Sequence, residues 1–306
     1  MTEKTEQYVN RTLSSGVVPV DLVSRPVRDC QSGETVALIT SAYINSIVYG
    51  VLSEEEFFAA SDMSETGVKF ALHCLKKAFR LLHSDRANGA YGPVKWISVR
   101  FPSGILLSGT LQSDLLSVTG GKKSEFAPRI CLVFGAEALP ILAGQNLAPL
   151  SVVRSLGYKI GFSGVTEENF PAAQLFRLAP DVLFTGEDFL SLWRTNAEAA
   201  LSYLRFFKTL GCDVVAEGDF TGREGTELAA SDCFGYAPPL PPYVPPAAVT
   251  ENTSPEQPET AAAAPEVPGE PVLSSAPETA DKPERTATRE TADKPEAEVT
   301  PAQEVD

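Results

Sequence analysis

The sequence predicts an α/β fold built on a parallel sheet, followed by an acidic, proline-rich tail. Two observations support this: strand-like and helical runs alternate up to about residue 235, and the composition changes abruptly at residue 238. Such alternation is typical of strands joined by crossover helices, and both an open doubly wound sheet and a closed barrel satisfy it. A body of residues 1–237 matches the typical length of one α/β barrel, about 250 residues.

The tail, residues 238–306, differs in composition from the body. It holds 15 of the 24 prolines, 14 acidic residues and 4 basic ones, and no aromatic residue follows Tyr243. Such a segment cannot bury enough apolar surface to offset the entropy of ordering it, so it is predicted to be disordered. The copies at residues 278–284 and 290–296 are a low-complexity repeat.

The charge of the body excludes one class of function. The chain carries −15 and the tail 4 − 14 = −10, so the body carries −5. Its basic pairs, Lys76-Lys77 and Lys122-Lys123, are isolated, and we therefore expect no nucleic-acid binding.

The cysteines and the start of the chain indicate a reducing compartment. Cys30, Cys74, Cys131, Cys212 and Cys233 are scattered and odd in number, which favours small buried apolar residues over a disulfide framework or a zinc site. The first seven residues are polar and lack the order of a secretory signal. A cytoplasmic location is expected.

One uncharged segment is long enough to be tested as a membrane span. Residues 35–53 carry no charge, but they are interrupted by Ser and Asn and are rich in Val, Ile, Thr and Tyr. Buried strands of a parallel sheet have this composition. The segment is therefore predicted to be sheet, with no membrane association.

In the N-terminal half, residues 3–14 have a helical pattern. Strand-like runs follow at 17–27 and 36–52, joined by a turn at 29–33 and with a break near Asn45. Ser53-Glu-Glu-Glu56 is a capping box that begins a short helix. A longer helix is expected over 64–84, and the Asn88-Gly89 turn leads into a strand at 94–101.

In the C-terminal half the alternation continues. Helices are expected near 104–117, 147–156 and 172–178, and strands at 130–134, 158–162 and 181–184. One long amphipathic helix is predicted over 187–210, ended by Gly211 as its C-cap. A strand at 213–216, a helix at 223–229 and a short strand at 233–235 complete the body. Gly120-Gly121-Lys122-Lys123 lacks the spacing and context of a phosphate loop and is predicted to be an ordinary loop.

Several motifs in this order resemble a known family. They are Arg25-Pro-Val27 with Gly33-Glu34, Ile97-Ser-Val-Arg-Phe101, Leu178-Ala-Pro-Asp-Val-Leu-Phe-Thr-Gly186, Leu210-Gly-Cys-Asp-Val-Val-Ala-Glu-Gly218 and Cys233-Phe-Gly-Tyr236. Together they resemble the bacterial EAL domain, a cyclic di-GMP phosphodiesterase, over residues 5–238. The resemblance implies a TIM-like (β/α) barrel whose active face lies at the carboxyl ends of the strands. It also implies magnesium or manganese ions held by carboxylates and an asparagine, which activate a water for attack on the phosphodiester.

The sequence departs from that family at almost every functional position. Other residue types stand where the motifs place the metal ligands and the ligand-binding side chains, namely Ile39, Tyr43, Arg100, Val133, Ser163, Gly164, Phe184, Gly186, Phe220 and Phe234. Of the matched acidic set only Glu217 remains. Hard divalent cations need several oxygen ligands, so we expect no catalytic residue, metal or cofactor, with Glu217 as the vestigial candidate. Glu137 could stand in for Val133 if a gap is allowed, and Asp219 lies next to the lost glutamate.

Each remaining candidate has a structural alternative. Glu217 could cap a helix or pair with a lysine, and Arg100 could pair with Glu217 across the mouth or contact a phosphate. His73 and His83 share one predicted helix with no partner set for catalysis.

Three hypotheses follow in order. The first is a catalytically inactive EAL-like domain that acts as a regulatory or protein-interaction module in bacterial signalling, with an unidentified protein partner and dimerisation left open. The second is a cyclic di-GMP receptor that binds without cutting, and the third is a residual phosphodiesterase.

Overall fold

The structure is a computed structural model that describes residues 3–14, 20–46, 50–88, 94–143, 147–164, 176–186, 188–220, 223–231 and 233–245. Residues 1–247 form one compact unit. The tail beyond residue 245 lies outside the described residues, so its disorder stays a prediction. The helix expected at 172–178 lies largely outside them as well.

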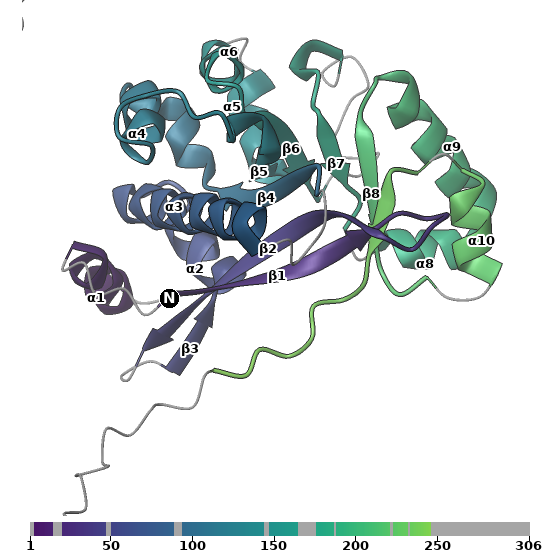
Figure 1. The fold of residues 1–306 in the computed structure, drawn as a ribbon, viewed down its shortest axis with the longest axis horizontal. Coiled ribbons are helices and arrows are strands. Elements are labelled where there is room, and N and C mark those ends of the chain that lie inside the picture. The colour runs from purple at the N-terminus through teal and green to yellow at the C-terminus, as the bar shows by residue number, and fades with distance from the viewer. Residues whose placement is uncertain are drawn as a thin grey trace, which may run out of the picture. The chain divides into compact units, whose positions relative to one another are not determined.

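Eight of the described strands close into a barrel (Figure 1). Their order around it is β1, β9, β8, β7, β6, β5, β4 and β2, and β2 pairs with β1 to complete the ring. A further strand, β3 (Gly50–Ser53), pairs with the far end of β2. The barrel strands are β1 (Val20–Arg28), β2 (Thr35–Ser46), β4 (Trp96–Phe101), β5 (Ile130–Gly135), β6 (Lys159–Ser163), β7 (Val182–Phe184), β8 (Asp213–Glu217) and β9 (Gly235–Ala237). The prediction of a closed α/β barrel is confirmed.

The first strand runs against its neighbours. β1 is antiparallel to both β2 and β9, whereas the seams from β2 through β4 to β9 are parallel. The cause is the short turn between β1 and β2, in which Asp29 Oδ1 accepts from the backbone of Gln31 at 3.0 Å and of Ser32 at 2.7 Å. A turn of this length can join only antiparallel strands. The sheet is therefore mixed, and the all-parallel expectation is wrong at β1.

Helices cover the outside of the barrel (Figure 1). They are α1 (Glu3–Ser14), α2 (Glu54–Ser61), α3 (Glu65–Asn88), α4 (Leu111–Ser117), α5 (Leu139–Ala143), α6 (Ala148–Ser155), α8 (Asp188–Thr195), α9 (Ala197–Thr209) and α10 (Arg223–Ala229), with 3₁₀ turns η1 (Ser103–Leu107), η2 (Ala127–Arg129) and η3 (Ala136–Ala138). The predicted capping box at Ser53 and Glu56 is present. Among the described residues, no helix is long and apolar enough to cross a membrane.

The single long helix expected over 187–210 is wrong. It is two helices, α8 and α9, with Asn196 between them in an extended-like conformation (φ −150°). The Asn196 side chain accepts a hydrogen bond from the Ala199 amide at 3.1 Å and so caps α9. Gly211, with a φ of +76°, ends α9 as predicted.

The interior of the barrel is filled by its own apolar cluster. The cluster comprises Val27, Ala37, Ile39, Trp96, Cys131, Val133, Val182, Phe184, Val215 and Ala237. Trp96 stacks on Phe234 with ring centroids 5.6 Å apart and meets Phe184 edge-on at 5.9 Å. Side chains thus pack the middle of the barrel up to the level of Phe184, and a hollow mouth lies above them at the carboxyl ends of the strands.

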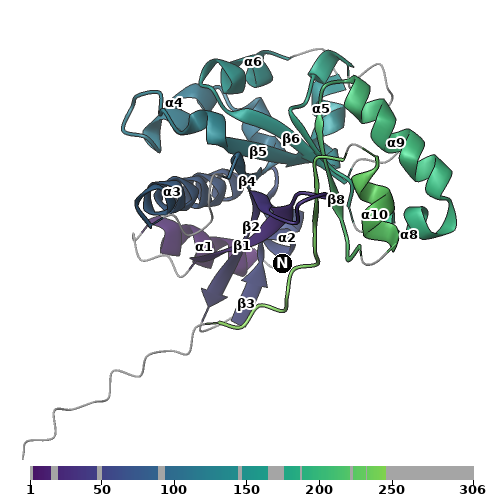
Figure 2. The same ribbon diagram turned by 45° about the vertical axis from the view of Figure 1, so that its right-hand side comes forward.

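After β9 the chain continues along the barrel as residues 238–245, here called the strap, which extends toward β3 (Figure 2). The Tyr243 ring stacks on Tyr43 with centroids 4.1 Å apart and planes 7° from parallel. Its hydroxyl hydrogen-bonds with Asp21 and accepts from Asn45 Nδ2 at 2.7 Å. These residues belong to the segment predicted to be tail, so the ordered body extends past the expected boundary at 237. Composition marked them as tail, but Tyr243 and the Pro238 carbonyl bond them to the barrel.

Candidate functional site

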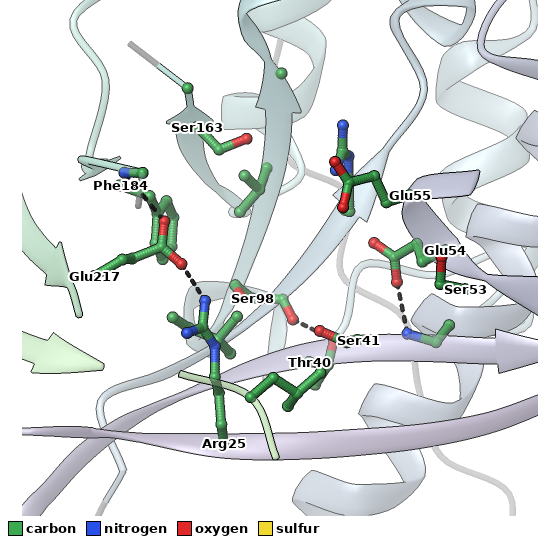
Figure 3. Close-up of a pocket in the computed structure, with 18 of the residues that line it drawn as sticks. Arg25, Thr40, Ser41, Ser53, Glu54, Glu55, Ser98, Ser163, Phe184 and Glu217 are labelled. Carbon is green, nitrogen blue, oxygen red and sulfur yellow. Dashed lines mark hydrogen bonds and ion pairs between the residues drawn. The ribbon is translucent and has the colours of Figure 1, made fainter. Parts of the chain in front are cut away.

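The mouth of the barrel encloses a cavity of about 540 Å³ (Figure 3). It is lined by the carboxyl ends of the parallel strands, by the start of α2 and by Leu240 of the strap. This is the end of the barrel at which the sequence places a functional site.

Arg25 and Glu217 form an ion pair across the mouth (Figure 3). Each side chain is 15% exposed. The second carboxylate oxygen of Glu217 accepts from the Gly186 amide at 3.2 Å, and the guanidinium of Arg25 also donates to the Pro238 carbonyl at 2.9 Å. The carboxylate at the end of β8 is therefore engaged by the chain's own donors on both oxygen atoms.

The predicted pair between Arg100 and Glu217 is wrong. Arg100, near the end of β4, lies 3.6 Å from Glu137, which follows β5. These side chains are 32% and 44% exposed, and an ion pair so open to solvent contributes about 0–1 kcal/mol. Glu217 pairs with Arg25 because β1, running antiparallel, brings that arginine to the mouth.

Glu54, the first residue of α2, is a buried acid beside the cavity and was missed by the sequence analysis, where it is only part of a capping box. Its side chain accepts from the Ala42 amide at 2.8 Å (Figure 3). Burial raises the pKa of Glu54 to about 7, against the opposing effects of that hydrogen bond and of the charge on Arg100. No pattern in one sequence marks this burial, because it depends on how α2 packs against β2.

The positions at which the motifs place metal ligands and ligand-binding side chains fall in four surroundings. Ile39, Val133 and Phe184 belong to the apolar cluster of the barrel but also line the floor of the cavity, and Ser163, Gly164 and Gly186 line its wall. Tyr43 also lines it, under the strap. Phe220 packs outside the strands against Trp193 and Phe189, and Phe234 lies at the lower end on Trp96.

The described side chains do not fit a hard divalent cation. A magnesium or manganese ion needs several oxygen ligands. Glu217 is bound by Arg25, Glu137 by Arg100, and the pKa of Glu54 near 7 leaves that carboxyl partly protonated at neutral pH. Within the described ranges no group of three or more His, Cys, Asp or Glu side chains is arranged to hold a metal.

The other residues singled out from the sequence lie away from the mouth. Neither histidine lines the cavity: His83 packs edge-on against Phe126 at 4.4 Å, and burial lowers the pKa of His73. Gly120 and Gly121 have φ values of +71° and +82° in the predicted loop.

Comparison with known proteins finds likeness in structure alone. No protein-family profile and no curated protein matches the sequence. The PaMucR phosphodiesterase in complex with c-di-GMP superposes with a TM-score of 0.65 at 16% identity, covering 76% of this chain and 94% of that one. The FimX EAL domain gives 0.65 at 12%, covering 78% and 94%. The EAL enzyme Bd1971, bound to cAMP and cyclic-di-GMP, gives 0.64 at 16%, covering 77% of this chain but only 64% of its own length.

Proposed function

Because this chain has the EAL-domain fold, we propose that it is a non-catalytic domain of that type, acting by contact as a regulatory or protein-interaction module in bacterial signalling. The observation that carries the proposal is the pairing at the mouth. Glu217 and Glu137 are each bound by an arginine of the same chain, Arg25 and Arg100. The oxygen atoms of Glu217, the more buried of the two acids, are thereby used internally.

The energetics support the loss of metal chemistry. A cation that took Glu217 as a ligand would have to displace Arg25 and leave a largely buried guanidinium without its partner. Breaking such a pair costs about 3–5 kcal/mol when the pair is fully buried.

The floor of the mouth supports the same conclusion. Ile39, Val133 and Phe184 are 8%, 6% and 3% exposed and offer no oxygen atom. Water activation needs a metal or a general base within hydrogen-bond reach of the substrate. The described residues on this floor supply neither.

A contact role needs an accessible surface, and two exposed apolar side chains offer a candidate. Met63 and Leu107 are each 62% exposed. They lie on neighbouring segments, because η1 packs against the turn that holds Met63 at Gly104. A Met63→Ser/Leu107→Ser variant should lose a partner recovered from the native host, whereas Val51→Ser, at a 41% exposed side chain on β3, should retain it.

A calorimetric titration of the full chain with cyclic di-GMP, with and without magnesium, tests the proposal directly. We expect neither binding heat nor conversion to the linear dinucleotide. Heat without turnover would favour a receptor, and turnover that requires magnesium would refute the non-catalytic reading. An active EAL phosphodiesterase run in parallel confirms that the ligand and the metal are competent.

A second candidate, a cyclic di-GMP receptor, is favoured by one observation. Arg25 and Arg100 both line a cavity of about 540 Å³, and the partner of Arg100 is a half-exposed glutamate that gives it up at little cost. Under this reading Arg100 contacts a phosphate. Arg100→Ala should then weaken binding at least tenfold, and unchanged affinity would eliminate that contact.

A further inference from the structure

A second cavity, of about 290 Å³, opens at the opposite end of the barrel from the mouth. Three cysteines line it together with two lysines, and its lining includes Asp29, Cys30, Gln31, Lys95, Lys208, Cys212, Asp213, Ala229, Cys233 and Phe234. The sequence analysis treats the cysteines as separate apolar residues. The fold brings positions 30 and 233, which are far apart in the chain, to one place.

These two cysteines lie beside the pairing of β1 with β9, which has the fewest registered residue pairs of the described barrel strands. β1 and β9 are registered through a single residue pair, Arg28 with Tyr236, whereas β8 and β9 share three pairs and β1 and β2 share nine. Cys30 follows Arg28 and Cys233 precedes Tyr236, so the antiparallel register carries the two thiols to the same edge. Both side chains line the same cavity, where the Cys233 thiol also donates to the Val214 carbonyl at 3.1 Å.

The surroundings make Cys233 the more reactive of the two. The neighbouring Cys30 thiol lowers the pKa of Cys233 against the effect of burial, with smaller help from the backbone of Gly235 and Ala216 and from the charge of Lys208, and Cys233 in turn raises the pKa of Cys30. By contrast, burial raises the pKa of Cys212 to about 12 and the pKa values of Cys74 and Cys131 well above their ordinary range. A thiolate is the nucleophilic form of cysteine, and both Cys30 and Cys233 are only partly buried.

We propose that Cys30 and Cys233 are an oxidation site at which a peroxide forms a disulfide across the β1–β9 seam. The Cys233 thiolate attacks one peroxide oxygen, breaking the O–O bond and leaving a sulfenic acid and, after protonation, water. The Cys30 sulfur then attacks the sulfenic sulfur, and a second water leaves. The balance is two thiols and one hydrogen peroxide to one disulfide and two waters.

The disulfide would cross-link the chain beside β1 and β9, the neighbouring strands that share only one registered residue pair among those described. A cross-link between residues 30 and 233 closes a loop that contains almost the whole barrel, and the entropy removed from an unfolded chain grows with the size of the loop. The oxidised protein should therefore melt higher than the reduced one, by on the order of 10 °C. The site lies away from the mouth and is independent of what the mouth binds.

The test treats the folded full chain with graded hydrogen peroxide, followed by non-reducing digestion and mass spectrometry. We expect a cross-linked peptide pair that contains Cys30 and Cys233, a higher Tm, and reversal of both by dithiothreitol. Cys30→Ser should leave a sulfenic acid on Cys233 that dimedone traps, and Cys233→Ser should leave none at Cys30.

Cys212→Ser is the matched control, because Cys212 lines the same cavity but burial raises the pKa of its thiol to about 12. This variant should form the cross-link as the parent does. A disulfide formed mainly with Cys212 would overturn the proposal. So would a folded parent chain in which peroxide oxidises other thiols but forms no link between residues 30 and 233. The peptide map of the parent chain decides the matter even if a serine variant fails to fold.

Discussion

Replacing Arg25 by methionine should destabilise the barrel strongly, because it leaves Glu217 charged and largely buried without its cation. The methionine keeps the aliphatic bulk but removes the ion pair and the hydrogen bond to the Pro238 carbonyl. Breaking a buried pair costs about 3–5 kcal/mol, and the 15% exposure of both side chains places this one near the lower end. We expect the free energy of unfolding to fall by about 3 kcal/mol, which corresponds to a Tm lower by roughly 6–12 °C for a body of this size.

The assay is urea unfolding of the full chain followed by circular dichroism, with Arg28→Met as the control. Arg28 lies on the same strand, but its side chain is exposed and bonds only to the Gly33 carbonyl at 3.3 Å, so its loss should stay within about 0.5 kcal/mol. An Arg25→Met/Glu217→Leu double variant should recover much of the loss, because no buried charge then remains unpaired. The reasoning is refuted if Arg25→Met is as stable as Arg28→Met, or if the double variant is no better than the single one.

Three further perturbations test the acid at α2, the strap and the barrel interior. Between its ordinary pKa of 4.5 and about 7, folded Glu54 keeps a proton that the unfolded chain releases, so its contribution to stability is full at low pH and lost as the pH rises through 7. Glu54→Gln should flatten that decline between pH 5 and 8 in urea melts at each pH. Tyr243→Ala should lower the free energy of unfolding by about 1–2 kcal/mol, because it removes both the ring stack and the hydroxyl hydrogen bonds. Tyr243→Phe keeps the stack and should lower it less. Equal losses for the two variants would contradict a stabilising role for the stack. Gly161→Ala places a Cβ 2.9 Å from a sulfur in the barrel and should cost about 1–3 kcal/mol, whereas Gly109→Ala, where the Cβ meets nothing within 4 Å, should be neutral in thermal melts.

Much of the barrel could be predicted from the sequence because each local pattern agrees with the fold. The capping box at Ser53 and the glycine at 211 begin and end helices through bonds that span a few residues, and such bonds are visible in the chain itself. The break between α8 and α9 was missed because apolar residues continue through it. Asn196 marks the break only if it is recognised as an N-cap.

The contacts of the mouth could not be predicted, because they depend on strand direction and tertiary packing. Glu217 was identified as a strand-end carboxylate, but the partners considered for it were a helix, a lysine or Arg100 on a parallel strand. The actual partner, Arg25, faces the mouth only because the turn at Asp29 reverses β1. The contact between Cys30 and Cys233 has the same origin, since it arises at the seam where the first and last strands meet.

The barrel interior is packed independently of the side chains at the mouth. The apolar cluster around Trp96 fills the barrel without help from the mouth, so side chains above it can change without emptying the core. Ile39, Val133 and Phe184 extend that cluster upward, and Arg25 neutralises the carboxylate that remains. A functional site normally holds unpaired charge at a cost in stability. Pairing that charge internally recovers stability, and it is the arrangement expected of a barrel that acts through its surface.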